Sequence, residues 1–132
     1  MLEYAKRLGD LTFEEAGSAL RVTQRILKLA LETRDPLYRD RLFREAFDSL
    51  FYAARIAAMT YLSTEVAKWG LLRRTLPEPY NRRFRVLIDV LHIKYFYNGE
   101  YPKDGVMEEF NKWYRIVEEF IKSLEHEIEK KQ

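Results

Sequence analysis

One segment constrains the fold of this chain more than any other, residues 42–62 with the sequence LFREAFDSLFYAARIAAMTYL. Steps of three and four residues place side chains on one face of a helix. One apolar stripe at this spacing consists of Phe43, Phe47, Leu50, Ala54, Ala57 and Tyr61, and a second consists of Leu42, Ala46, Ala53 and Ile56. A helix that is apolar nearly all round is buried among other helices. We therefore predict that this segment is the central helix of an all-α domain.

The segment before it predicts a first helix packed antiparallel to the central one. Thr12 and Glu15 form a capping box that predicts a helix start at Thr12. The polar run from Glu32 to Asp35 predicts that this helix ends near Thr33. Asp35 followed by Pro36 is typical of an N-cap and a first helical residue. The link between the two helices is therefore short, and such a link makes neighbouring helices antiparallel.

Two more helices follow a connection rich in glycine and proline, GLLRRTLPEP at residues 70–79. We expect a third helix over about 79–97, which ends at Asn98 and Gly99. A last helix follows Asp104, its expected cap. Its apolar residues recur at helical spacing and are Val106, Phe110, Trp113, Val117, Phe120, Leu124 and Ile128.

These elements predict a single domain over residues 1–132, a four-helix up-and-down bundle. Residues 1–10 are expected to form an N-terminal lead-in, and residues 125–132 a frayed tail. The central helix ends near Ser63 or continues to Lys68 with Gly70 after it, and the longer form is favoured. The connection 63–79 leaves room for a short extra helix.

Composition narrows the setting in which the protein acts. The chain has no cysteine, which excludes disulfides and thiol chemistry and is consistent with a reducing cytoplasm. No uncharged run is long enough to suggest a membrane span. Charged residues make up 33% of the chain, and asparagine and glutamine are scarce, a bias seen in proteins from hot environments. We expect a cytoplasmic protein that does not enter a membrane.

The third helix carries two apolar sides. At about 100° per residue one side contains Tyr80, Phe84, Leu87, Ile88, Leu91 and Tyr95, and the other contains Val86, Val90, Ile93 and Tyr97. One side faces the core of the domain. The second needs a partner, either another part of the same chain or a second copy. We expect a homodimer through this helix.

A polar stripe between these two sides holds the candidate catalytic residues. Arg85 and His92 are seven residues apart and share a face, with Asp89 between them. The guanidinium is expected to bind a phosphate and the imidazole to take or return a proton, while Asp89 orients the imidazole or holds the guanidinium. Arg55 is expected to reach Asp89 from the central helix. A salt-bridged surface stripe remains the alternative, because the chain is rich in arginine.

Residues 73–99 form the one strongly basic stretch, with six basic and two acidic residues and a net charge of +4. Arg73, Arg74, Arg82 and Arg83 are therefore expected to bind or steer RNA. Asp89 and His92 also have the spacing of half a di-iron site, but Ser123 stands three residues before His126, so the second half is missing. We expect no metal and no cofactor.

The chain resembles the HEPN family of small helical-bundle proteins. The resemblance lies in SALRVTQRILKLALE, in REAFDSLFYAARIAAMTYL and in FYNGEYPKD. It implies a helical bundle, a dimer and, in many members, metal-independent ribonuclease activity carried by an arginine and a histidine with four to six residues between them. Arg85 and His92, with six residues between them, match that motif at its long limit. Val86 departs from the polar residue that often follows the arginine.

The resemblance implies an RNA-binding protein that is either a metal-independent endoribonuclease of toxin type or not an enzyme. Members of the family often pair with a nucleotidyltransferase antitoxin, so a non-catalytic module that binds such a partner is the first alternative. A structural dimeric bundle, in which the polar stripe sets the register of the dimer, is the second.

Overall fold

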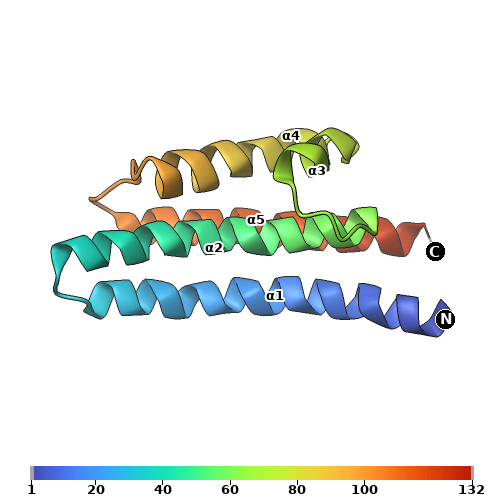
Figure 1. Ribbon diagram of the computed structural model, residues 1–132, viewed down its shortest axis with the longest axis horizontal. Helices are drawn as coiled ribbons and strands as arrows, with labels where there is room; N and C mark the ends of the chain where they lie inside the picture. Colours follow the sequence, from blue (N-terminus) through green and yellow to red (C-terminus); the bar gives the residue numbers. More distant parts are fainter. Residues whose placement is uncertain (1, 132) are drawn as a thin grey trace.

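The computed structural model describes the backbone of residues 2–131 and the side chains of residues 13–131. The described chain consists of helices and short connections without a strand, so the all-α class is confirmed. The helices are α1 (Leu2–Glu32), α2 (Pro36–Leu62), α3 (Trp69–Thr75), α4 (Tyr80–Leu87), η1 (Ile88–Tyr97) and α5 (Val106–Lys130) (Figure 1). α4 passes directly into η1, so residues 80–97 form one long helix. α2 contacts α1, α5 and η1 and is therefore the central helix, as predicted.

The first helix is longer than the sequence predicts. Its backbone is helical from Leu2, well before the predicted start at Thr12, and it takes in most of the expected lead-in 1–10. Inside a continuous helix, the backbone N–H groups already have partners one turn earlier, so a capping box has none left to bind. The side chains of residues 1–12, and with them the contacts of Thr12, lie outside the described residues.

α2 starts as predicted and ends earlier than the favoured prediction. The side chain of Asp35 accepts hydrogen bonds from the backbone N–H groups of Leu37 and Tyr38, which confirms the N-cap. The helix ends at Leu62, because Ser63 turns into the left-handed conformation with φ of 52°. The N–H of Ser63 then bonds back to the carbonyls of Met59 and Thr60, which closes the last turn. The shorter of the two alternatives is therefore correct.

The core of the protein forms around α2. Phe47 is fully buried, and its ring lies 4.8 Å from the ring of Tyr95 on η1 and 6.0 Å from that of Phe110 on α5, between centroids. The four buried alanines of the predicted stripes are Ala46, Ala53, Ala54 and Ala57. Small side chains let neighbouring helix axes approach closely. The predicted burial is confirmed for the residues of the two stripes except Tyr61 and Ile56, which are half-buried, while Tyr52 on the same helix is exposed.

The second half of the long helix 80–97 is wound as a π-helix, which the sequence does not predict. η1 extends over ten residues, Ile88–Tyr97. π-winding joins residues five apart, so each residue turns by less than the roughly 100° of an α-helix. The predicted core side is buried. The predicted second apolar side and the polar stripe do not form two separate faces. Val86, Ile93 and Tyr97 are exposed on the same stretch of helix as Arg85 and Asp89.

The loop after η1 is fixed by a contact from α2. Arg44 donates hydrogen bonds from Nε to the carbonyl of Phe96 and from Nη2 to that of Tyr97, both at 2.7 Å. These are carbonyls at the end of a helix, where a cation is favourable. Gly99 follows in the left-handed conformation with φ of +69°, and a Cβ there would lie 3.3 Å from the guanidinium of Arg44. Packing at this junction therefore explains the glycine of the FYNGEYPKD pattern.

α5 begins and ends differently from the prediction. Gly105, not Asp104, occupies the N-cap position, in a left-handed conformation with φ of 71°, and no side chain caps the helix. Its buried residues follow the predicted apolar pattern from Phe110 to Leu124. The helix continues to Lys130, so most of the segment expected to fray is helical in this structure.

Alkaline pH is expected to destabilise the fold through Tyr95. Burial and the hydrogen bond that Tyr95 donates to Glu109 raise the pKa of Tyr95 from 10.0 to about 12. A raised phenol pKa means that the folded state favours the protonated form. This contribution is therefore complete below pH 10 and is lost as the pH rises through about 12. Urea unfolding between about pH 9 and 12 should show a falling midpoint.

Tyr95→Phe is the matched variant for that measurement, because it removes the titrating group and keeps the ring. Its unfolding midpoint should fall less steeply over the same pH range than that of the wild type. Equal slopes for the two proteins would contradict the assignment to Tyr95. Burial and the hydrogen bond to Asp40 also raise the pKa of Tyr101, so the double variant Tyr95→Phe/Tyr101→Phe should be flatter still.

Candidate functional site

His92 has a defined partner, which comes from a different helix than predicted. Its Nδ1 lies 2.7 Å from Oδ1 of Asp48 on α2. The side chains of His92 and Asp48 are 25% and 30% exposed, so the pair is half-buried. A carboxylate that accepts a hydrogen bond from Nδ1–H leaves Nε2 as the free nitrogen of a neutral imidazole. The pair therefore fixes the tautomer and the orientation of the ring.

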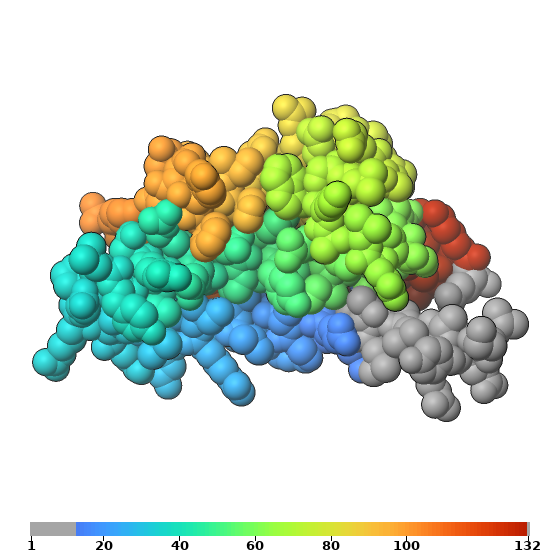
Figure 2. All heavy atoms as spheres, viewed as in Figure 1, coloured from blue at the N-terminus to red at the C-terminus, as the bar shows by residue number. Residues whose placement is uncertain are grey.

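Three aromatic side chains hold the imidazole in place. Its centroid lies 5.2 Å from that of Phe51 on α2, 5.8 Å from that of Phe96 on η1 and 6.0 Å from that of Trp69 on α3. α2, α3 and η1 therefore meet at His92. Figure 2 views the molecule from the side on which α3 lies over α2, with η1 beside it.

The other ring nitrogen of His92 is available to a ligand. Nε2 makes no hydrogen bond among the described residues, and every buried side-chain nitrogen or oxygen in that part of the chain has a partner. Nε2 must therefore reach solvent. A fixed imidazole with one anchored and one accessible nitrogen can accept a proton from a substrate and return it.

Arg85 and Asp89 pair with each other and not with His92. Arg85 Nε lies 3.8 Å from Asp89 Oδ2, and their side chains are 64% and 60% exposed. The orienting contact expected from Asp89 is instead made by Asp48. The physical reason is the π-winding, which moves His92 by roughly a quarter of a turn from its position in an α-helix. His92 consequently faces α2, while Asp89 stays on the solvent side with Arg85.

The four arginines expected to bind RNA lie in different surroundings. Arg82 pairs with Glu78 at 3.8 Å and is largely exposed. Arg83 packs its guanidinium against the rings of Tyr80 and Phe120, at 5.8 Å and 5.6 Å from their centroids, and so faces α5. Arg73 and Arg74 form the last turn of α3. Their role in binding stays a prediction.

Arg55 does not make the contact expected with Asp89. Its Cζ lies 5.4 Å from the ring centroid of Tyr52 and 5.9 Å from that of Phe51, both on its own helix. Asp89 is paired with Arg85. Arg55 and His92 therefore lie against the same phenylalanine ring.

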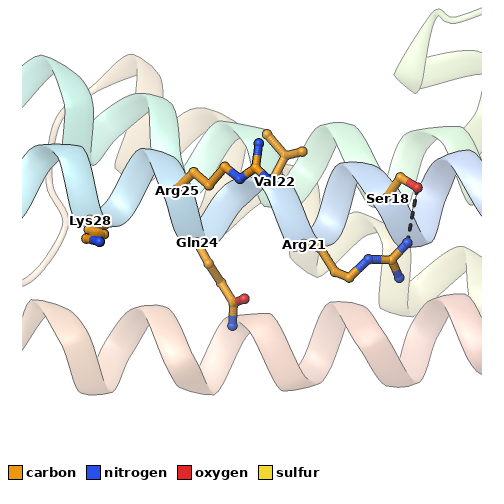
Figure 3. A pocket seen from close by; sticks show the side chains of 6 residues that line it. All are labelled: Ser18, Arg21, Val22, Gln24, Arg25 and Lys28. Atoms are coloured by element: carbon orange, nitrogen blue, oxygen red, sulfur yellow. Dashed lines mark hydrogen bonds between the residues drawn. The ribbon is translucent and has the colours of Figure 1, made fainter.

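A second basic surface lies on α1, away from His92. Figure 3 shows the hollow there, which is lined by Ser18, Arg21, Val22, Gln24, Arg25 and Lys28. Arg21 donates a hydrogen bond to Ser18 Oγ at 3.1 Å. Residues 18–28 contain three basic and no acidic residues. This local cluster is missed when charges are summed over longer segments, because acidic residues elsewhere in those segments cancel it. All lining residues come from one helix, so the surface is open and orients a ligand weakly.

Asp48 and Trp69 complete the surroundings of His92, and sequence reasoning assigned neither of them to the site. Asp48 and His92 are 44 residues apart, so their pairing depends on how α2 packs against η1. Asp48, Phe51 and Arg55 are three and four residues apart, which places them on one side of α2. This spacing is the one feature of the sequence that could have pointed to Asp48. It is hard to recognise, because the apolar residues of the same helix have the same three- and four-residue spacing.

Comparisons with protein-family models, curated proteins and solved structures find no match for this chain. Within the described residues, no helix combines the length and apolar character needed to cross a membrane.

Proposed function

We propose that this chain is a HEPN-like four-helix bundle of the cytoplasm that binds RNA and cleaves it without a metal ion. The observation that carries the proposal is the hydrogen bond between Asp48 and His92 Nδ1, which leaves Nε2 free at the surface. π-helical segments occur frequently at functional sites, and η1 contains His92. The resemblance to the HEPN family supplies the substrate class.

In the proposed reaction, His92 acts first as a base and then as an acid. Nε2 takes the proton of a ribose 2′-hydroxyl, and the 2′-oxygen attacks the adjacent phosphorus. The bond to the 5′-oxygen breaks, and the imidazolium returns its proton to that oxygen. The products are a 2′,3′-cyclic phosphate and a 5′-hydroxyl. Asp48 stabilises the imidazolium, while Arg85, Arg82, Arg83, Arg73 and Arg74 attract the RNA backbone.

RNA cleavage in excess EDTA tests this function. The wild type should cleave, and His92→Ala should lose at least about 100-fold in rate, because the general acid and base are gone. Asp48→Asn should also be slow, since an amide does not stabilise the imidazolium. His126→Ala is the matched control, because His126 is exposed on α5 and should not matter. Intact RNA after incubation with the folded wild type would rule out the enzyme.

A non-catalytic module that binds a nucleotidyltransferase-type partner is the second candidate, favoured by one observation. Val86, Ile93 and Tyr97 are exposed on the outer side of the long helix 80–97, and Tyr97 is 73% exposed. Exposed apolar side chains close together are typical of a protein interface. We propose that the same surface forms a homodimer.

The homodimer predicts a sedimentation result. The wild type should sediment as a dimer, and Ile93→Asp/Tyr97→Asp should sediment as a monomer at the same concentration. Leu71→Asp is the control, because Leu71 is a comparably exposed apolar residue on α3. A wild type that stays monomeric at high concentration would contradict the proposed interface.

A further inference from the structure

Arg55 is a half-buried cation without an acidic partner. Of the three arginines in the first half of α2, Arg41 pairs with Glu45 at 3.3 Å and Arg44 with Asp40 at 3.7 Å, while Arg39 lies over the ring of Phe43. Among the described residues, no carboxylate lies within ion-pair distance of Arg55. Its guanidinium lies instead near the rings of Phe51 and Tyr52. A partly buried charge of this kind favours an anion from outside the chain.

His92 shares the ring of Phe51 with this cation, and its Nε2 makes no hydrogen bond among the described residues. The rings of His92 and Phe51 are 5.2 Å apart between centroids, and the guanidinium carbon of Arg55 is 5.9 Å from the same Phe51 centroid. Trp69 lies at the edge of the imidazole, and its indole N–H has no acceptor among the described residues. The nearby carboxylate of Asp48 is already bound to Nδ1 of His92. Asp48 keeps its other oxygen, Oδ2, as an acceptor. The donors around Phe51 that an anion could use are the guanidinium of Arg55, the indole N–H of Trp69 and, once the imidazole is protonated, Nε2 of His92.

The aromatic surroundings strengthen an interaction at this position. Phe51, Trp69 and Phe96 exclude water from the sides of the imidazole, and Coulomb attraction grows as the local dielectric constant falls. Arg85 offers less, because it is 64% exposed and already paired with Asp89. Exposed ion pairs contribute little.

We propose that Arg55 and His92 form a binding site for a single phosphate group, with Arg55 in the role that the sequence assigns to Arg85. This inference rests on the proposed function, because it names the residue that holds the scissile phosphate beside the acid and base. Arg55 binds the non-bridging oxygens, and Nε2 of His92 faces the oxygen that gains or loses the proton.

Titration with inorganic phosphate tests the site without any RNA chemistry. Nuclear magnetic resonance of the isotope-labelled protein should show saturable shifts at the His92 ring and at Arg55 Nε–H in the millimolar range. Arg55→Met keeps the length of the side chain without its charge and should weaken phosphate binding at least about tenfold. Arg55→Lys should retain part of the affinity. Arg41→Ala, on the same helix and far more exposed, should bind as the wild type does.

Two results would overturn the phosphate site. One is a wild type without saturable shifts at His92, and the other is an Arg55→Met protein that is folded by circular dichroism and binds phosphate normally. Loss of binding in Arg85→Ala with retention in Arg55→Met would assign the phosphate to Arg85 instead.

Cleavage assays separate this inference from the proposed function. Phosphate binding that depends on Arg55, together with intact RNA, would leave the site in place and remove the enzyme. RNA cleavage that depends on His92 but not on Arg55 would leave the enzyme and remove the role of Arg55. If the proposed ribonuclease function and the Arg55 phosphate site are both correct, Arg55→Met should reduce the rate of RNA cleavage at least about tenfold.

Discussion

Replacing Phe47 with alanine is expected to lower the free energy of unfolding by about 3–5 kcal/mol. Phe47 is fully buried, and its ring packs between Tyr95 of η1, Phe110 of α5 and Tyr101 of the loop between them. Alanine would leave a cavity where α2 meets both partner helices. Such a loss is a large share of the stability of an ordinary domain. Urea unfolding followed by circular dichroism measures it.

Tyr38→Ala is the control for that measurement. Tyr38 lies in the first turn of the same helix and is about half exposed, so its loss should change the unfolding free energy by about 0.5 kcal/mol or less. If the two variants lost similar stability, the central position of Phe47 in the core would be wrong.

Replacing Arg44 with alanine is expected to cost about 2–3 kcal/mol, the second largest effect. Arg44 donates hydrogen bonds to the carbonyls of Phe96 and Tyr97 and packs against Gly99. Without it, the end of η1 loses its charged partner, and the loop at 98–105 keeps only the contacts with α2 that Tyr101 and Lys103 make. Thermal unfolding gives the change in stability. Amide hydrogen exchange should show that faster opening is concentrated at residues 95–101.

Arg41→Ala tests whether the effect belongs to the contact or to the charge. Arg41 lies one turn from Arg44 and makes an exposed pair with Glu45. Exposed pairs contribute little, so this variant should remain within about 0.5 kcal/mol of the wild type. A cost as large as that of Arg44→Ala would show that net charge, and not the clamp on η1, sets the stability.

The parts of the fold that follow from local patterns could be predicted from the sequence. The burial of 42–62 follows from its apolar spacing, and the start of α2 follows from Asp35 and Pro36. The sequence favoured the wrong end of α2, because serine has no strong preference for the left-handed conformation that Ser63 adopts, whereas a glycine such as Gly70 is the usual residue there. Tertiary packing decided between the two.

The geometry of the candidate site depends on the π-winding of η1, which no pattern in the sequence indicates. The shared face of Arg85, Asp89 and His92 assumes uniform α-winding, and η1 departs from it after Leu87. His92 itself was found, because a histidine on a polar stripe is conspicuous. Asp48 was not, because a partner in another helix is fixed by packing and not by spacing.

The π-winding of η1 also bears on the length of the chain. A π-helix holds more residues in each turn than an α-helix, so η1 contains more residues than an α-helix of equal length needs. Loss of one residue between Leu87 and His92 could be absorbed by a return to α-winding. The same deletion in α2 would rotate every later apolar residue away from the core. Variation in length among natural forms of this protein is therefore expected in η1 and not in α2.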